Sequence, residues 1–517
     1  MVDPVAEARA VLPGWVGWLG PALHLLVGVV AVALLSRLAR AIAFRPAPAD
    51  AHWTERARRG QALRSIGVFT LWVIPISFAT TARLVTGPMT LVPEGLTVLL
   101  TAVACFAVGL RDHLAMMASY RPFPPRPAAW LGGAVVVVLV FMPILPLVVG
   151  LIWTAPTSPW TPTAALWATM AVALWVVAIR GHGIEAALVM RLARPAGPRL
   201  RAIVAEASRE VGRPPPPTFE LAWWIANAAA FPFGHRLVFT DGALDHLDDD
   251  ELLAVCRHEL AHLAEPRAVL ALRALVSFAL LPLAAIIGNA VQLGTPVLLV
   301  ALASFLVLVI VSRRVQRRME ERADDHAHEG DVEVYARALA RLYEINGAPA
   351  VLRGRPIHPH LYDRLVAAGA TPSYPRPDPP PRARTLVAIL LIAILGVLAS
   401  ALVPILLPSA LPRMKDPTQA ATLAIAFNSE PAWHLAMLAH TRWEAGSLDA
   451  AAALYEAALE IGGPREVGEA ERSALVFLYA RQGHCDRAQA HFDWLKKEGA
   501  PELLPGTEMM MKTCVPR

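Results

Sequence analysis

The chain has 517 residues, of which 56% are hydrophobic and 17% charged, and its mean hydropathy is +0.46. Ordinary soluble domains are about 45–50% apolar and about 25% charged, so this composition excludes such a domain and a disordered chain. The net charge is +5, and four cysteines are too few for a scaffold held by disulfides. We therefore expect a membrane protein that crosses the bilayer several times.

Eight stretches of the chain are apolar over roughly the 20 residues that a helix needs to cross a bilayer. They are Trp15–Leu35, Ser65–Ala82, Thr90–Leu110, Ala129–Trp153, Ala164–Ile179, Val269–Asn289, Thr295–Ser312 and Leu386–Leu407. Because backbone polar groups must be satisfied inside lipid, these stretches predict transmembrane helices. The acidic N-terminus, with Asp3 and Glu7, lacks the basic segment of a cleavable signal peptide, so we expect the first stretch to remain as a span.

Arginine placement predicts the orientation, because basic loops stay on the cytoplasmic side. The first two predicted inner loops contain Arg37, Arg40, Arg45, Arg56, Arg58, Arg59, Arg64, Arg111, Arg121 and Arg126. The facing outer segments contain only Arg9 and Arg83. We expect a multi-pass protein of the inner or plasma membrane, with the polar segments 180–268 and 313–384 in the cytoplasm and the tail after Leu407 outside.

One His-Glu-x-x-His pattern, His258-Glu259-Leu-Ala-His262, lies in the first long polar segment. Its surroundings predict a helix, because Asp248–Asp250 suit the positive N-terminal end and apolar residues repeat along one side. Positions four apart share a helix face, so the two imidazoles can bind one cation while Glu259 is turned about 100° aside, near a water molecule. The alternative is an ordinary amphipathic helix. Cys256 falls on the opposite side, which predicts a packed thiol.

A hydrolytic zinc site needs a third protein ligand and keeps a fourth position open. After a predicted two-span hairpin comes the segment Glu320-Glu-Arg-Ala-Asp324. On a helix, Glu320 would reach the metal, and Asp324, one turn later, would accept the imidazole N–H of a histidine ligand. The alternative for this segment is a solvated, charged helix that leaves the membrane.

These residues resemble the M48 family of integral-membrane zinc metallopeptidases. Four blocks carry the resemblance, in the family's order: Asn227-Ala-Ala-Ala-Phe-Pro-Phe-Gly234, Val238-Phe-Thr-Asp-Gly-Ala-Leu244, His258-Glu-Leu-Ala-His262 and Glu320-x-x-Ala323-Asp324. His358-Pro359, followed by Arg364, is similar to a block that follows the third ligand in many members. The chain departs from the family where Ala229 replaces the commoner Phe or Tyr, and where Cys256-Arg257 replaces small apolar residues. These departures bear on substrate preference rather than on the metal.

The resemblance implies a zincin-type domain with a small β-sheet, one zinc ion per chain and peptide-bond hydrolysis. The implied site residues are the zinc ligands His258, His262 and Glu320, the general base Glu259, and Asp324 behind a ligand. It further implies that Asn227 and Ala228 lie on an edge strand along which an extended substrate pairs. His358 or Arg364 would stabilise the oxyanion. We expect a zinc metalloendopeptidase that cleaves membrane-associated or misfolded proteins.

The tail has apolar residues at helical spacing from Pro417 to Gly499. Two segments of it, 435–458 and 475–492, resemble tetratricopeptide repeats, and a generic bundle of helical hairpins is the alternative. Cys485 and Cys514 are the cysteines of this tail. An oxidising outer compartment would permit a disulfide between them, although the sequence does not fix their proximity.

The predicted fold is mainly α, a polytopic helical membrane protein of about eight spans with an M48-type catalytic domain and a C-terminal TPR-like domain. The predicted domains are the N-terminal membrane domain 1–179, the metallopeptidase domain 180–384 interrupted by the hairpin 269–312, the last span 385–407 and the extracytoplasmic domain 408–517. The expected partners are protein or peptide substrates, the lipid bilayer and a protein bound by the helical repeats, and we expect no nucleic acid.

Two other functions compete with this one. The first is an M56-type sensor-transducer, in which an outer domain switches a similar protease. It ranks lower because the tail lacks the Ser-x-x-Lys pattern of the usual outer domain. The second is a catalytically inactive membrane scaffold that presents helical repeats. An intramembrane site-2-type protease is disfavoured, since the charges at Asp248–Glu251 and Arg257 are too costly for the bilayer centre.

Overall fold

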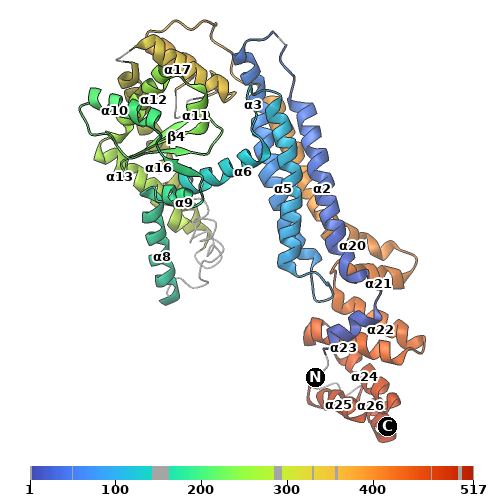
Figure 1. Ribbon diagram of the computed structural model, residues 1–517. Coiled ribbons are helices and arrows are strands. Elements are labelled where there is room, and N and C mark those ends of the chain that lie inside the picture. Colours follow the sequence, from blue (N-terminus) through green and yellow to red (C-terminus); the bar gives the residue numbers. More distant parts are fainter. Residues whose placement is uncertain are drawn as a thin grey trace. The chain divides into compact units, whose positions relative to one another are not determined.

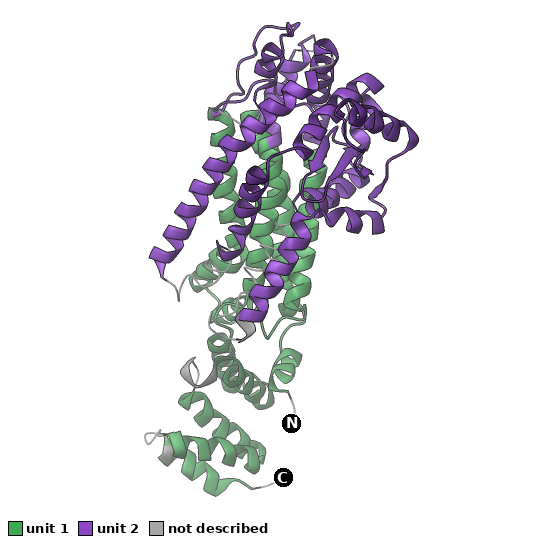
Figure 2. Ribbon diagram, turned by 90° about the vertical axis from the view of Figure 1, so that its left-hand side faces the viewer, with its two compact units in different colours: residues 1–43, 65–113, 383–517 green, residues 44–64, 114–382 purple. Residues whose placement is uncertain are grey.

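The computed structural model describes residues 3–48, 50–142, 162–283, 294–328, 331–354, 359–466, 468–498 and 503–515 (Figure 1). The described chain is mostly helical and contains one four-stranded sheet. It forms two compact units, each built from segments that are far apart in sequence (Figure 2). Unit 1 consists of residues 1–43, 65–113 and 383–517, and unit 2 of residues 44–64 and 114–382. Each unit therefore contains segments from more than one of the predicted domains.

Among the described residues, every regular element of unit 1 is a helix. Its elements are α1 (Pro4–Val11), α2 (Val16–Ala43), η1 (Phe69–Val73), α4 (Ile74–Thr81), η2 (Ala82–Val85), most of α5 (Glu94–Ala118), α19 (Ala383–Ala401), η4 (Leu402–Leu406), α20 (Leu407–Ala410), η5 (Leu411–Arg413), α21 (Pro417–Ala426), α22 (Pro431–Glu444), α23 (Leu448–Glu466), α24 (Glu469–Gln482), α25 (Cys485–Glu498) and α26 (Leu504–Thr513). Small residues bring its long helices together. A Cβ on Gly28 of α2 would lie 2.8 Å from Cys105 Sγ of α5, so only glycine permits this approach.

Several long apolar helices are consistent with a membrane protein. Within the described residues, five stretches are long and apolar enough to cross a bilayer: Val16–Ala43, Trp53–Val85, Glu94–Ala118, Thr295–His328 and Ala383–Arg413. Two bent helix pairs, Ala165–Ile179 with Gly183–Val189 and Asp249–Leu263 with Arg267–Leu283, would raise the number to seven. Parts of the expected spans Ala129–Trp153 and Val269–Asn289 lie outside the described residues, so the number of eight stays a prediction.

The C-terminal helices of unit 1 form two packed pairs, α22 with α23 and α24 with α25. Gly446 and Gly483 follow α22 and α24 with φ of +79° and +81°, the left-handed conformation that glycine adopts readily at helix ends. A disulfide joins Cys485 to Cys514, and α1 packs against α23 with Ala8 in the shared core. The two pairs coincide with the two expected repeats, whose assignment as tetratricopeptide repeats stays a prediction.

Unit 2 contains the sheet and its covering helices. Its elements are α3 (Trp53–Val68, whose last residues belong to unit 1), α6 (Pro127–Val136), η3 (Val137–Phe141), α8 (Pro162–Ile179), α9 (Gly183–Val189), β1 (Ala193–Pro195), α10 (Pro198–Glu210), β2 (Thr218–Leu221), β3 (Ala228–Phe231), β4 (Arg236–Thr240), α11 (Asp241–His246), α12 (Asp249–Leu263), α13 (Arg267–Phe278), α16 (Thr295–His328), α17 (Val332–Ile345) and α18 (Leu361–Ala367).

The sheet has the strand order β1-β2-β4-β3. β2 and β4 run parallel, and the outer strands β1 and β3 pair antiparallel with β2 and β4. Side chains alternate along β4, so Leu237 and Phe239 enter a core with α10, α12 and α17, whereas Val238 enters a second core with α6 and α9. Helices thus pack against both faces (Figure 1), and β3 is left as an edge strand among the described residues.

Candidate active site

Helix α12 carries the His-Glu-x-x-His pattern. A reciprocal cap fixes its start: Asp248 Oδ1 accepts the Glu251 N–H at 2.8 Å, and Glu251 Oε2 accepts the Asp248 N–H at 3.1 Å. Cys256 and Leu260 are buried in the core beside the sheet. The thiol is therefore packed, as the sequence predicts, and burial raises its pKa well above the ordinary range.

Helix α16 brings a carboxylate to this helix. Its first half is apolar, and charged residues begin at Arg313. Further along, Glu320, Ala323, Asp324 and Ala327 are buried, a spacing of three and four residues that marks one helix face. The two alanines on this face allow α16 to pack closely on α12, which carries both acidic side chains toward the histidines.

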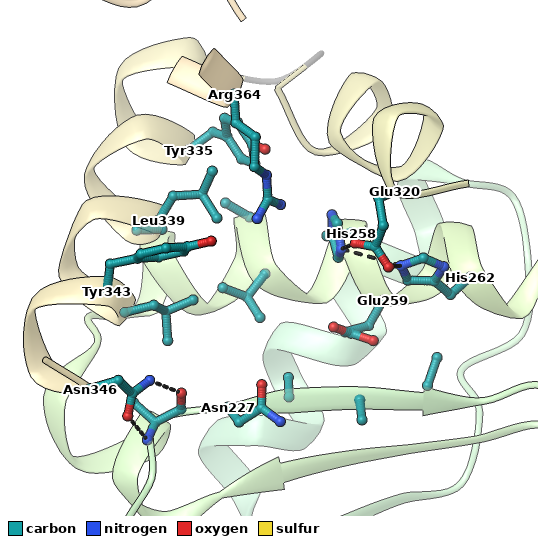
Figure 3. A pocket seen from close by; sticks show the side chains of 18 of the residues that line it. Asn227, His258, Glu259, His262, Glu320, Tyr335, Leu339, Tyr343, Asn346 and Arg364 are labelled. Carbon is teal, nitrogen blue, oxygen red and sulfur yellow. Dashed lines mark hydrogen bonds and ion pairs between the residues drawn. The ribbon is translucent and has the colours of Figure 1, made fainter. Parts of the chain in front are cut away.

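His258, His262 and Glu320 converge at one point (Figure 3). His258 Nε2 lies 3.3 Å from His262 Nε2, and each of these nitrogens lies 3.6 Å from a carboxylate oxygen of Glu320. Ligand atoms bound to a tetrahedral zinc at about 2.0–2.2 Å are about 3.3–3.6 Å apart. Both the spacing and the donor set fit zinc. Among the described residues, this is the one group of His, Cys, Asp and Glu that could hold a metal.

A carboxylate supports each imidazole from behind. Asp324 Oδ1 lies 3.1 Å from His258 Nδ1, and Glu265 Oε1 lies 2.7 Å from His262 Nδ1. When Nδ1–H donates to a carboxylate, the lone pair of Nε2 is left for a metal. Each histidine is therefore oriented with Nδ1 toward a carboxylate and Nε2 toward the candidate metal position, as metal binding requires.

An arginine in turn binds each supporting carboxylate. Arg364 donates two hydrogen bonds to Asp324, with Nε at 2.8 Å and Nη2 at 2.5 Å. Arg273 Nη2 donates one hydrogen bond to Glu265 at 2.7 Å. The site thus contains two supports of the same kind, each made of a histidine, a carboxylate and an arginine.

The support made of His258, Asp324 and Arg364 shifts the pKa values of its own side chains. His258 lies on the charged helix α12, and Asp324 lies beyond the apolar half of α16. Burial lowers the pKa of His258, but Asp324, Glu320 and Glu259 together outweigh burial and raise that pKa to about 9. Burial also raises the pKa of Asp324, yet His258 and Arg364 outweigh it and lower the pKa to about 2. Asp324 is therefore ionised and acts as an acceptor at neutral pH.

A cavity of about 440 Å³ lies beside the three converging residues, bordered by α12, α17 and β3. Glu259 faces it from α12, between the histidines and the edge strand (Figure 3). Asn227, which precedes β3, and Ala228, its first residue, also line the cavity. The cavity thus joins a candidate metal centre to an unpaired strand edge.

The site brings most of the expected residues together. His258, Glu259, His262, Glu320, Asn227, Ala228 and Arg364 line the cavity, and Asp324 contacts His258 from behind. His358 lies outside the described residues. The guanidinium of Arg364 is bound to Asp324, so its visible role is to support a histidine, and a role at an oxyanion stays a prediction. Arg257, which departs from the family pattern, binds Glu210 and does not line the cavity.

Sequence reasoning missed the second support. Glu265 lies three residues after His262, close to one helical turn, and this spacing was the available signal. The helix ends at Leu263, however, and Pro266 lies between α12 and α13, which meet at 83°. Because helical spacing breaks down at such a corner, the contact from Arg273 follows from the bend and not from periodicity.

Residues 196–385 match the model of Peptidase family M48. The matched segment contains β2 to β4, α12, α13, α16, α17 and α18, so it covers every element of the site. No curated protein and no solved structure matches the chain. This segment is thus similar to the M48 peptidases, and the similarity supports metallopeptidase activity.

Proposed function

We propose that this protein is a membrane-embedded zinc endopeptidase that hydrolyses peptide bonds in membrane-associated or misfolded proteins. The observation that supports this proposal most strongly is the set of spacings of 3.3 and 3.6 Å between His258, His262 and Glu320, beside a cavity that also contains Glu259. Two imidazoles, one carboxylate and a neighbouring free carboxylate are the groups that a hydrolytic zinc site requires.

His258, His262 and Glu320 would hold one zinc ion. Zinc in such a site lowers the pKa of a water molecule toward about 7 and polarises a carbonyl oxygen. Glu259 takes a proton from the attacking water and returns it to the leaving amine, because its carboxylate faces the same cavity. Asp324 and Glu265 keep both imidazoles oriented throughout. Water attacks the carbonyl directly, so hydrolysis proceeds without a covalent enzyme intermediate.

The substrate would lie extended along β3. Thr240 N–H of β4 donates to Asn227 O at 3.0 Å, so the backbone groups of Asn227 face β4. Alternation along a strand then turns the N–H and C=O groups of Ala228 and Ala230 to the open edge. A peptide that pairs with these groups is added to the sheet as a further strand and crosses the cavity next to Glu259.

The membrane placement of the site follows from arginine distribution, which favours cytoplasmic segments 180–268 and 313–384. The disulfide between Cys485 and Cys514 supports an extracytoplasmic tail, since disulfides persist in oxidising compartments. The helix pairs of that tail would bind a protein partner. Reporter fusions after Ala128, Gly212 and Pro408 are expected to report inside, inside and outside. An outside signal at Gly212 would contradict a cytoplasmic active site.

The catalytic proposal is tested with wild type and Glu259→Gln, purified in detergent. Both should hold about one zinc, and only wild type should cleave an unfolded protein substrate, because the substitution removes the proton acceptor and leaves the ligands. Glu321→Gln is the matched control, since Glu321 is exposed and pairs with Arg317. It should retain zinc and activity. Equal cleavage by wild type and Glu259→Gln, or a wild type without zinc, would overturn the proposal.

A further inference from the structure

The residues just before the edge strand β3 are bound by Asn346, at the end of helix α17. Asn346, the residue at the end of α17, binds Ala226 through both atoms of its amide: Nδ2 donates to Ala226 O at 2.7 Å, and Oδ1 accepts the Ala226 N–H at 3.1 Å. Figure 3 shows Asn346 at the margin of the cavity, next to Asn227. Its amide therefore pairs with Ala226 as a neighbouring strand residue would.

Ala226 belongs to the residues whose backbone groups face away from β4. Asn227 turns its carbonyl to β4, so the alternate residues Ala226, Ala228 and Ala230 turn their backbone groups away from β4. Asn346 binds the N–H and C=O groups of Ala226, the first of these residues. The corresponding groups of Ala228 and Ala230 can then pair with a substrate. The point at which substrate pairing begins is thus defined by a side chain of α17.

Asn346 is itself fixed by two arginines. Arg64 Nη2 and Arg121 Nη2 each donate to Asn346 O at 2.7 Å. This carbonyl belongs to the C-terminal end of α17, where unpaired carbonyls attract cations. Arg121 is only 7% exposed, and its guanidinium lies 4.3 Å from the ring centre of Trp224, two residues before Ala226. Arg121 therefore contacts both Asn346 and the segment that leads to Ala226.

The segment is also held from the sheet side. Thr240 Oγ1 accepts the Asn227 N–H at 2.9 Å and donates to Ile225 O at 2.6 Å. Asn346 and Thr240 together bind backbone groups of three successive residues ahead of β3. Arg64 lies in α3, which opens the apolar stretch Trp53–Val85, so one contact to this segment begins on a candidate membrane span.

We propose that Asn346 is a positioning residue, braced by Arg64 and Arg121, which sets the start of the strand edge on which the substrate pairs. This proposal rests on the proposed peptidase function and adds a determinant of substrate binding away from the metal. Asn346 touches neither the candidate ligands nor Glu259 in the contacts above. Its loss should therefore weaken pairing of extended substrates and leave metal binding and the chemical step intact.

The test compares wild type with Asn346→Ala on nested peptides that share one cleavage site and differ in length. Because two hydrogen bonds are lost, we expect KM for the long peptides to rise on the order of tenfold. The kcat value should change less than about threefold, zinc content should stay the same, and the shortest peptide should be cleaved as by wild type. Asn428→Ala is the matched control, since its amide donates to Thr86 O in unit 1. It should leave KM unchanged.

Arg64→Ala should raise KM for the long peptides in the same direction, and Arg64→Lys should restore it in part, because a lysine retains one donor for Asn346 O. Loss of zinc in Asn346→Ala, an equal loss of activity on short and long peptides, or a lower KM for long peptides would overturn the proposal. Hydrogen exchange gives an independent readout that needs no cleavage. The amides from Ile225 to Phe231 should exchange faster in Asn346→Ala than in wild type. Unchanged exchange would also overturn the positioning role of Asn346. A wild type without peptidase activity would instead contradict the proposed function.

Discussion

The two supports behind the candidate zinc ligands differ in how the chain assembles them. The local support consists of His262, Glu265 and Arg273, from α12, α13 and the turn between them. The long-range support consists of His258, Asp324 and Arg364, from α12, α16 and α18. The first forms as soon as the α12–α13 corner forms. The second requires three elements to be packed, so it reports on the tertiary structure of the whole site.

The arginines of the two supports differ in burial as well. The side chain of Arg364 is 7% exposed, whereas that of Arg273 is 26% exposed. A buried charge that loses its partner is not hydrated, and removal of one partner costs about 3–5 kcal/mol. A partly exposed charge that loses its partner is hydrated by water. The same chemical arrangement therefore contributes to fold stability in one support and mainly to ligand orientation in the other.

The largest effect is expected from Asp324→Ala. It removes the acceptor for His258 and leaves the buried guanidinium of Arg364 unpaired. Zinc affinity should fall about 100-fold, and the free energy of unfolding should fall by about 3–5 kcal/mol. Zinc titration against a competing chelator and Tm measured in detergent would check both. Asp325→Ala is the control, because Asp325 is exposed, and it should change neither zinc affinity nor Tm. An unchanged Tm in Asp324→Ala would show that Arg364 does not become an unpaired buried charge.

A smaller effect is expected from Glu265→Gln. The amide no longer offers a charged acceptor to His262 Nδ1, so zinc affinity should fall about tenfold. The free energy of unfolding should change by only about 1 kcal/mol, because Arg273 is hydrated once its partner is neutral. The same zinc titration and Tm measurement apply. A loss of Tm equal to that of Asp324→Ala would show that burial does not distinguish the two supports.

The sequence predicted those parts of the site that follow from local spacing. His258 and His262 share a face because α12 is a regular helix with a strong cap, and Cys256 is buried for the same reason. The need for a third ligand pointed to the block around Glu320, and the resemblance to a family favoured it over a solvated, charged helix. The structure packs this block on α12 through the buried alanines of α16. The edge position of β3 came from the same resemblance and agrees with the strand order.

The remainder depends on contacts between distant segments. Arg364 meets Asp324 across 40 positions of the chain, and Arg121 meets Asn346 across 225, and no periodicity relates residues so far apart. The division into two units also depends on contacts between residues far apart in sequence. Residues 44–64 join unit 2 although they lie between parts of unit 1 in sequence, and α1 packs on α23 near the other end of the chain. Hydropathy identifies each apolar helix but contains no information on its partners.

The smallest effect is expected from Arg273→Lys, and its comparison with Arg364→Lys sharpens the contrast between the supports. Arg273 donates one hydrogen bond to Glu265 from a partly exposed position, which a lysine ammonium can replace, so zinc affinity should stay within about twofold of wild type. Arg364 binds both oxygens of Asp324 through Nε and Nη2, and a lysine cannot reproduce this geometry. Arg364→Lys should therefore lower zinc affinity about fivefold. Equal losses of zinc affinity in Arg273→Lys and Arg364→Lys, measured by the same chelator titration, would contradict this prediction. They would show that the two hydrogen bonds from Arg364 to Asp324 do not strengthen zinc binding.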